Sequence, residues 1–257
     1  MKNLLLDWPA AGIARLTLSQ PARRNALNAA MWQALPGLLK TIEEDPSLRA
    51  LIVTGDGDHF AAGADISEFG TLYATADSAA KISADIQRAF DALAAVPVPT
   101  IAMIRGACVG GGCGLSLCCD LRFADSTAKF AITPAKLGLV YPFGDITRLI
   151  DAVGVANASD MLLSARVLKA EDAKSIGLVH RVVDVDALEN EVMDYINIIT
   201  ALSPESLRVT KSMITAYRNG QRQDTPKTRQ QFAAGFSSKD FGEGFRAFLE
   251  KRKPDFK

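Results

Sequence analysis

Short apolar runs recur through the first half of the chain. Residues 13–18 alternate apolar and polar side chains, as a half-buried strand does, whereas residues 50–54 and 100–105 are mostly apolar and are typical of buried strands. Two shorter extended pieces are expected at residues 121–124 and 129–132. Together these segments predict the strands of a sheet.

Apolar residues at helical spacing lie between these strands. Residues 26–44 and 86–95 are expected to be helices, and Pro36-Gly37 is expected to kink or divide the first of them. From Asp145 onward the chain is mostly helical, apart from an extended piece at 179–183. This order predicts an α/β core followed by a helical covering layer or interface.

Composition and charge narrow the class of protein. The chain has 257 residues, of which 48% are hydrophobic and 23% charged, so we expect a packed core. The 29 Lys and Arg residues balance 29 Asp and Glu residues, which leaves no overall attraction for nucleic acid or an anionic membrane. No run approaches the ~20 apolar residues of a membrane span, and Asp7 interrupts an N-terminal run too short for a signal peptide. We therefore expect a cytoplasmic protein with neither nucleic acid nor membrane as a partner.

The four cysteines, Cys108, Cys113, Cys118 and Cys119, fall in or beside one glycine-rich stretch. They form no Cys-x-x-Cys pair and have no histidine near them in sequence, so we expect no metal site. Small buried thiols in a reducing compartment are the expected role.

The glycine-rich stretch itself, residues 110–120, is the most informative part of the chain. It follows the strand at 100–104 and leads into a helix expected at 115–119, an arrangement that leaves backbone N–H groups unpaired at the helix start. Such groups can stabilise developing negative charge on an oxygen. The spacing does not match a dinucleotide fingerprint, a P-loop or a Gly-x-Ser-x-Gly elbow. A tight turn that packs a helix against a strand explains the glycines equally well.

A second loop, Phe60-Ala-Ala-Gly-Ala-Asp-Ile66, is also rich in small residues, which let a ligand lie against the backbone. Asp65 stands where a helix would begin, so we expect it to act as an N-cap.

With the two loops at this separation, the sequence resembles the crotonase superfamily, also called the enoyl-CoA hydratase/isomerase family. Residues 21–27 resemble its first CoA-contacting loop, residues 60–66 its acyl-CoA loop, and residues 105–113 with Cys119-Asp120 its second oxyanion loop. Later segments that match the family's signatures are residues 165–166, 171–178 and 247–254.

The resemblance implies an α/β fold of ββα units wound into a spiral, with a C-terminal helical region that mediates trimerisation. We expect the spiral core at residues 1–195 and the helical region at 196–257. The implied partners are an acyl-CoA thioester substrate and further copies of the chain, in a homotrimer or a dimer of trimers. The implied activity is that of a lyase or isomerase of fatty acid metabolism, with no cofactor beyond the coenzyme A of the substrate and no metal.

The helical half carries more apolar positions than one α/β core readily covers, which also favours a subunit interface. These positions include Met193, Ile196, Ile199, Phe232, Phe236, Phe241, Phe245 and Phe248.

The resemblance also implies specific site residues. The backbone N–H groups of Ala64 and Gly111 would bind the thioester oxygen as an enolate forms, because two preorganised donors stabilise such an oxyanion. The residues that correspond to coenzyme A contacts are Arg24, Ala26, Leu27, Ala62, Ala64, Asp65 and Ile66.

The sequence departs from the family at both acid/base positions. Family hydratases have a glutamate where this chain has Gly114 and a second where it has Pro134. Neither residue can activate water or deliver a proton to carbon, so we expect hydration to be inefficient. Lys136 lies nearby, and we expect it to be solvated.

Other polar residues are candidates to replace the two missing glutamates. Tyr141 belongs to a Thr-Pro-x-x-Leu-Gly-x-x-Tyr string similar to one in family decarboxylases; it either contacts substrate or is a core aromatic residue. Asp145 is a second catalytic candidate, although we expect it to cap a helix. Glu68 is expected to be solvated, His59 to lie near the surface, and His180 to be structural.

The sequence therefore predicts an acyl-CoA-binding enzyme that stabilises a thioester enolate and is not an efficient ordinary hydratase. Two alternatives stay open. One is decarboxylation of a malonyl-type thioester, which needs an enolate sink more than a general base. The other is a non-catalytic CoA-binding member of the family.

Overall fold

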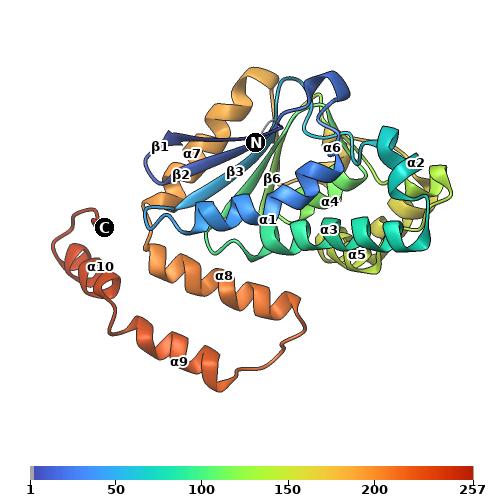
Figure 1. Ribbon diagram of the computed structural model, residues 1–257. Helices are drawn as coiled ribbons and strands as arrows, with labels where there is room; N and C mark the ends of the chain where they lie inside the picture. Colours follow the sequence, from blue (N-terminus) through green and yellow to red (C-terminus); the bar gives the residue numbers. More distant parts are fainter. Residues whose placement is uncertain (1–2, 257) are drawn as a thin grey trace.

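The computed structural model describes residues 3–256. Its main sheet has six strands in the order β1-β2-β3-β4-β6-β9, and all neighbours are parallel except β1 and β2 (Figure 1). The strands are β1 Leu4–Ala10, β2 Ile13–Leu18, β3 Ala50–Gly55, β4 Thr100–Ile104, β6 Leu121–Asp125 and β9 Arg181–Val183. Every residue of β3 and β4 is buried, as expected for parallel strands covered on both faces.

A second sheet has three short strands, of which one precedes the glycine-rich stretch in sequence and two follow it. It consists of β5 Ala107–Val109, β7 Lys129–Ala131 and β8 Leu168–Lys169, with β5 parallel to β7 and β7 antiparallel to β8. The sequence pattern did not predict β1, β5 or β8. β1 has seven residues, whereas β5 and β8 have only three and two, and β5 is bounded by glycines that hide its extended character.

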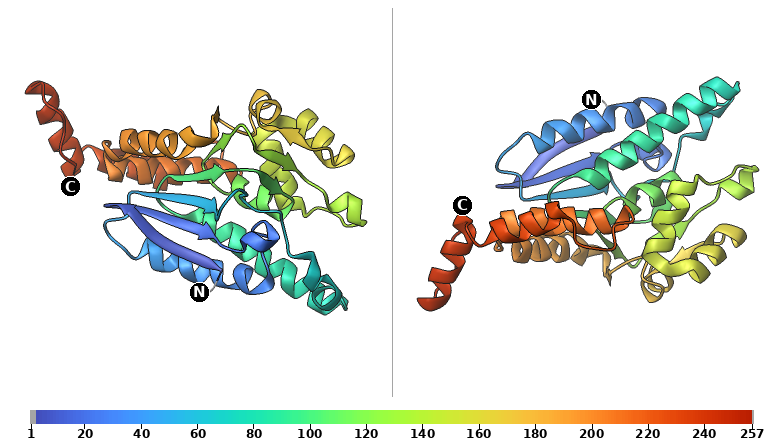
Figure 2. Two further views of the ribbon diagram at one scale, coloured as in Figure 1. Left: turned by 90° about the horizontal axis from the view of Figure 1, so that it is seen from above. Right: turned by 90° about the horizontal axis from the view of Figure 1, so that it is seen from below.

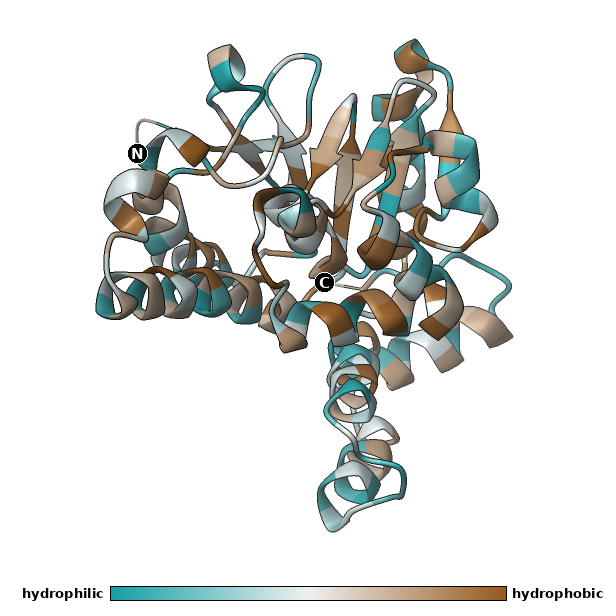
Figure 3. Cartoon of the chain, turned by 90° about the vertical axis from the view of Figure 1, so that its right-hand side faces the viewer, coloured by the Kyte–Doolittle hydropathy of each residue, from teal (hydrophilic) through white to brown (hydrophobic). Residues whose placement is uncertain are grey.

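Helices cover both faces of the main sheet (Figure 2). One face packs against α1 Ala29–Glu43, α3 Ala76–Ala95, α4 Gly111–Leu117 and α5 Phe143–Ser164, and the other against α7 Leu188–Thr200. Residues of the strands alternate between the two cores: Val53 belongs to the first, and Ile52 packs with Leu188 and Ile196 of α7 in the second. Figure 3 shows apolar colours concentrated in these strands.

Short elements connect these layers. They are 3₁₀ turns at Pro21–Arg23, Ile66–Glu68, Pro134–Leu137 and Val185–Ala187, and the helices α2 Phe69–Leu72 and α6 Ala170–Ser175.

Helix α1 corrects one expectation, because it is not divided at Pro36-Gly37. It begins after Asn28, whose side chain accepts a hydrogen bond from the Met31 N–H (2.9 Å), and continues to Glu43. Pro36 is only half-buried, whereas the buried face of the helix, including Leu35 and Leu39, stays packed on the core. Tertiary packing thus outweighs the hydrogen bond that proline removes.

The C-terminal helices form a separate tier below the sheet in Figure 1: α8 Pro204–Arg218, α9 Pro226–Gly235 and α10 Lys239–Leu249. Helix α8 is tied to the core by Lys211, which donates to the Val98 carbonyl and pairs with Asp120, both at 2.6 Å. In both views of Figure 2, α10 extends beyond the rest of the chain. The boundary expected between residues 195 and 196 falls inside α7, so the division into two regions stays a prediction.

The outer two helices expose most of their apolar side chains. Phe232, Phe236, Phe241 and Phe245 form a continuous series of ring contacts, and each is at least 48% exposed. Within residues 3–256, no helix is long and apolar enough to cross a membrane.

Candidate active site

The glycine-rich stretch forms the start of helix α4. Gly110 has a positive φ of 53° and its N–H donates to the Ala131 carbonyl (2.8 Å), and the helix then begins at Gly111, earlier than the sequence pattern predicted. A Cβ on Gly112 would collide with the backbone oxygen of Ala61. Glycine therefore lets α4 lie directly against the second loop.

Three chain segments meet at this point. Leu27, from the first loop, bridges to Ala64: its N–H donates to the Gly63 carbonyl (2.7 Å), and its own carbonyl accepts from the Asp65 N–H (2.8 Å). This pairing uses the Gly63 carbonyl and the Asp65 N–H, on either side of Ala64, but not the N–H of Ala64 itself.

Two backbone N–H groups come close together where the loops meet. A Cβ placed on Gly111 would lie 3.6 Å from the Ala64 nitrogen, and one on Gly63 would lie 3.5 Å from the Gly111 nitrogen. Within residues 3–256, neither the Ala64 N–H nor the Gly111 N–H donates a backbone hydrogen bond. Both donors are therefore available to an acceptor from outside the chain.

The space beside Gly114 is already filled. A Cβ placed there would lie 2.9 Å from Cζ of Phe90 and 3.0 Å from the hydroxyl oxygen of Tyr141. The phenol of Tyr141 thus occupies the place that a side chain at position 114 would need. The position is a glycine because any larger residue would displace one of the two rings.

The Tyr141 hydroxyl is buried, and it has no hydrogen-bond partner among the described residues. Burial raises the pKa of this phenol well above its usual value, and Asp145 and the Cys113 thiol act in the same direction. The hydroxyl is therefore protonated at neutral pH and can act as a hydrogen-bond donor or a proton source.

The second missing glutamate position, Pro134, opens the 3₁₀ turn Pro134–Leu137. The turn is held near the glycine stretch through Thr133, whose hydroxyl oxygen would lie 4.0 Å from a Cβ on Gly110. Lys136 is exposed, as expected. The segment thus places no carboxylate beside the glycine stretch.

Asp145 does not cap a helix, contrary to expectation. Helix α5 begins two residues earlier, at Phe143, with Pro142 as its N-cap residue. The Asp145 carboxylate is buried in the first turn and accepts from Arg148 (3.0 Å), which also pairs with Asp91 (2.6 Å). Burial raises the pKa of Asp145 to about 6, although Arg148 opposes the shift.

The residues expected to contact coenzyme A form one strip along the first two loops. Arg24 has a positive φ of 50°, and its carbonyl accepts from the Ala62 N–H (2.9 Å). Ala26 and Leu27 are buried, whereas Ile66 is 63% exposed. The structure therefore brings these residues together, although only part of the strip is open to solvent.

Asp65 is an N-cap, as expected: its side chain accepts from the Ser67 N–H (3.1 Å). The same carboxylate pairs with Arg23 (2.5 Å), a residue that the sequence analysis did not single out. These contacts hold the second loop against the first.

The remaining candidates make structural contacts. Glu68 is half-buried and accepts from the Ala29 N–H (2.8 Å) at the start of α1, so it is not simply solvated. His59, also half-buried, accepts at Nδ1 from the Ala107 N–H (3.1 Å). His180 accepts at Nδ1 from the Arg122 N–H (3.1 Å), in agreement with a structural role.

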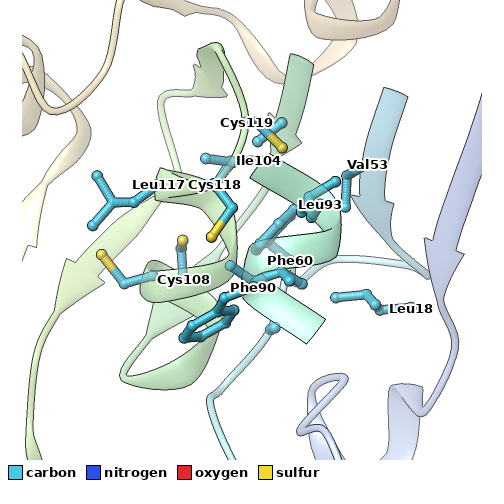
Figure 4. Packing of buried hydrophobic residues seen from close by; sticks show 14 of the residues in the cluster. Leu18, Val53, Phe60, Phe90, Leu93, Ile104, Cys108, Leu117, Cys118 and Cys119 are labelled. Atoms are coloured by element: carbon cyan, nitrogen blue, oxygen red, sulfur yellow. The ribbon is translucent and has the colours of Figure 1, made fainter. Parts of the chain in front are cut away.

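The four cysteines are free and buried, as expected, and Figure 4 shows Cys108, Cys118 and Cys119 among apolar side chains. Burial raises the pKa of Cys119 to about 12, so this thiol is unreactive at neutral pH. Residues 3–256 contain no cluster of three or more His, Cys, Asp or Glu side chains arranged to hold a metal ion.

A cavity of about 640 Å³ lies at the other end of α4, beside α3, α5 and α8. Its lining includes Arg122, Arg148 and Arg218 but not Ala64, Gly111 or Tyr141. The unpaired donors, rather than this cavity, mark the candidate active site.

Two aromatic residues at the site, Trp32 and Phe90, were not predicted from the sequence. Both lie at apolar positions of predicted helices, where a core role is the usual explanation. Steric contact with the glycines locates them: Trp32 Cζ2 lies 3.3 Å from a Cβ placed on Gly111, and Phe90 Cζ lies 2.9 Å from a Cβ placed on Gly114.

Known proteins similar to this chain agree with the fold and the loops. The sequence model of the enoyl-CoA hydratase/isomerase family matches residues 9–257. A probable enoyl-CoA hydratase of Mycobacterium bovis is 37% identical over 242 residues, covering 94% of this chain and 93% of that protein. A crotonyl-CoA hydratase of Syntrophomonas wolfei is 35% identical over 260 residues, covering 99% and 98%.

A solved structure extends the similarity to three dimensions. The crystal structure of an enoyl-CoA hydratase/isomerase family protein from Hyphomonas neptunium superposes with a TM-score of 0.96 at 44% identity, covering 99% of this chain and 97% of that one. The chain therefore belongs to the enoyl-CoA hydratase/isomerase family and has the crotonase fold.

Proposed function

We propose that this protein binds an acyl-CoA thioester and stabilises its enolate between the N–H groups of Ala64 and Gly111. The observation that carries the proposal is that both N–H groups are unpaired and close together at the meeting point of the two loops. Loss of one such preorganised donor typically lowers a rate by about 100- to 1,000-fold, so the pair would supply much of the catalysis.

The coenzyme A would lie along the strip that includes Arg24, Ala26, Leu27, Ala62, Asp65 and Ile66. Small side chains and turned backbone leave main-chain groups there within reach of a ligand. No cofactor beyond coenzyme A enters the proposal. The four free thiols fit a reducing, cytoplasmic setting.

We propose further that ordinary hydration is slow in this protein. Addition of water to an enoyl thioester needs one group that activates water and one that protonates carbon. Gly114 and Pro134 supply neither, and the Phe90 and Tyr141 side chains fill the space beside Gly114. The hydratase names of the relatives describe those proteins, and the two glutamate positions are where this chain differs from the family pattern.

The buried hydroxyl of Tyr141 favours a second candidate reaction, decarboxylation of a malonyl-type thioester. In that reaction the electrons of the breaking C–C bond pass into the thioester enolate and CO₂ departs. A proton is then delivered to Cα, and the Tyr141 O–H is a buried proton source that water can later reprotonate. No base is required to activate water. A non-catalytic CoA-binding role would leave the unpaired hydroxyl without a use.

The exposed aromatic series on α9 and α10 supports assembly with other copies of this chain, as a homotrimer or a dimer of trimers. Light scattering coupled to size-exclusion chromatography at micromolar concentration measures the mass directly. We expect three or six times the chain's 27.5 kDa, and a monomer would contradict the assembly.

A comparison of two substrates tests the proposed function. Crotonyl-CoA hydration should be slower than in a two-glutamate relative by several powers of ten, since each general acid or base contributes about 10²–10⁴-fold. Release of CO₂ from malonyl-CoA or methylmalonyl-CoA is the second measurement. Hydration at ordinary hydratase rates would contradict the proposal, and turnover of neither substrate with intact CoA binding would favour the non-catalytic alternative.

A further inference from the structure

Two buried hydrogen-bond donors near α4 have no partner in the described chain: the indole N–H of Trp32 and the hydroxyl of Tyr141. Burying an unpaired donor destabilises a fold by about 1–3 kcal/mol, so native proteins rarely keep one without a use. Asp125 Oδ2 is also unpaired, but its neighbour Oδ1 accepts from both the N–H and the hydroxyl of Thr127. Among residues 3–256, only the two aromatic residues have a buried side chain whose single polar group is unsatisfied.

Both residues touch the same face of α4. Trp32 lies against Gly111 and Tyr141 lies against Gly114, at 3.3 Å and 3.0 Å from the respective Cβ positions. Helix positions i and i+3 are neighbours on one face, with about 5–6 Å between their Cβ atoms. The two side chains therefore lie along one line, a single helical turn apart.

Phe90 joins these two residues into one surface. Its ring meets the Trp32 ring edge-on with centroids 5.5 Å apart, and its Cζ lies 2.9 Å from the Cβ position of Gly114. We call Trp32, Phe90 and Tyr141 the aromatic wall. The wall faces the glycine side of α4, and its two ends carry the unpaired donors.

The Trp32 end of the wall adjoins the proposed thioester site. The Cβ position of Gly111 that touches Trp32 lies 3.6 Å from the Ala64 nitrogen. A thioester whose oxygen is bound by the two backbone N–H groups would thus have its acyl carbons near the Trp32 end of the aromatic wall.

We propose that Trp32 determines substrate specificity: its indole N–H, together with the Tyr141 O–H, selects acyl groups that carry an oxygen acceptor beyond the thioester over plain hydrocarbon chains. This inference rests on the proposed acyl-CoA site and goes further by assigning the substrate class. A hydrocarbon chain leaves the buried donors unpaired, and a site built to hydrogen-bond a substrate discriminates strongly against analogues that lack the partner.

Both donors are neutral, and the guanidinium that stands over the Phe90 ring is already ion-paired. Arg148 stands 5.8 Å from the Phe90 ring, on a side chain that pairs with Asp91 and Asp145. A neutral hydroxyl oxygen can therefore accept hydrogen bonds from these neutral donors without any need for a counter-ion. A carboxylate would be bound without a counter-ion, which favours its departure as CO₂. The experiment includes one ligand of each kind.

Tryptophan fluorescence gives the first readout. The chain has two tryptophans, and Trp8 is 39% exposed whereas Trp32 is 1% exposed. In the Trp8→Phe variant, Trp32 is the only tryptophan, and excitation at a wavelength that tyrosine does not absorb selects its emission. We expect its emission to shift to longer wavelength on addition of 3-hydroxybutyryl-CoA or malonyl-CoA, because the indole N–H gains an acceptor, and not on addition of butyryl-CoA. The same response to all three ligands, or to none, would overturn the inference.

Calorimetric titration gives the second readout. Trp32→Phe keeps an aromatic ring and removes the N–H, so we expect about tenfold weaker binding of the oxygenated ligand that the unmodified protein prefers and less than a twofold change for butyryl-CoA. Trp8→Phe is the matched control and should alter neither. An equal loss for both classes would assign Trp32 a packing role and overturn the inference. Failure of the unmodified protein to bind any CoA thioester would instead contradict the proposed function. If Trp32→Phe does not fold, the fluorescence result decides.

Discussion

The two ends of helix α4 differ in how their polar groups are paired. At the C-terminal end, Ser116 and Cys118 donate to backbone carbonyls of the helix, at 2.8 Å and 3.3 Å. Just beyond it, the buried Arg122 donates to the carbonyls of Cys119 (3.0 Å) and Leu178 (2.7 Å). These groups hold the fold together.

At the N-terminal end, neighbouring polar groups are unpaired. The Gly111 N–H and the Tyr141 hydroxyl have no partner within the described residues, and neither does the indole of Trp32. Unsatisfied groups destabilise a buried region, whereas satisfied groups do not. The comparison indicates that one end of the helix is arranged for stability and the other for a ligand, and that the two should respond to mutation in opposite ways.

The largest expected effect is at the paired end. Lys211→Met removes the contacts to Asp120 and the Val98 carbonyl and leaves the carboxylate without its cation, so the free energy of unfolding should fall by about 3 kcal/mol. Denaturant unfolding measures the loss. The exposed Lys174→Met is the control and should change stability by less than about 0.5 kcal/mol. Equal stabilities of the two variants would remove the distinction between the ends.

The next prediction concerns the glycine at the unpaired end. Gly114→Glu restores the family's acid but forces its Cβ against Phe90 and Tyr141, so it should destabilise the protein by about 1–3 kcal/mol without restoring crotonyl-CoA hydration. The double variant Gly114→Glu with Tyr141→Ala removes one of the two close contacts and should hydrate faster than either single variant. If Gly114→Glu alone hydrates crotonyl-CoA as fast as a two-glutamate relative, the Phe90 and Tyr141 rings must move aside at little energetic cost, which would contradict the prediction.

A smaller but more diagnostic effect comes from two hydroxyl deletions. Ser116→Ala removes a paired hydroxyl and should lower the free energy of unfolding by about 1 kcal/mol. Tyr141→Phe removes an unpaired one, so stability should stay constant or rise by about 1 kcal/mol while turnover of the preferred substrate falls. A stability loss in Tyr141→Phe as large as in Ser116→Ala would mean that its hydroxyl is structural.

The last prediction is a pH dependence at Asp145. Because its pKa of about 6 in the folded chain exceeds its unfolded value, the folded state binds more protons between pH 4 and pH 6. Stability should therefore decline as pH rises through this window, and Asp145→Asn should abolish that part of the decline. Identical stability–pH curves for the variant and the unmodified protein would contradict the buried, Arg148-paired position.

The sequence predicted the loops better than the elements around them. Motifs at residues 21–27, 60–66 and 105–113 identified the family because small residues and glycines there are required by close backbone approach. The helix start at Gly111 was missed, since glycine has a low intrinsic helix propensity. The close packing of the next residue, Gly112, against Ala61 is not visible in the sequence.

Side-chain roles were harder to predict. Asp145 resembles an N-cap in sequence, but the cap position depends on where Pro142 ends the preceding turn. Trp32 looks like any apolar helix residue, and its unpaired N–H is visible only when α1, α3 and α4 are packed together. Local patterns carry no information about which distant groups lack a partner.

The central claim is that the N–H groups of Ala64 and Gly111 bind a thioester oxygen. Infrared difference spectroscopy of an acyl-CoA with an isotope-labelled thioester carbonyl tests it most directly, because hydrogen bonds to that oxygen lower its stretching frequency. The account predicts a clear downward shift on binding, which persists in Tyr141→Phe. A bound ligand whose carbonyl frequency equals that in water or higher would contradict it.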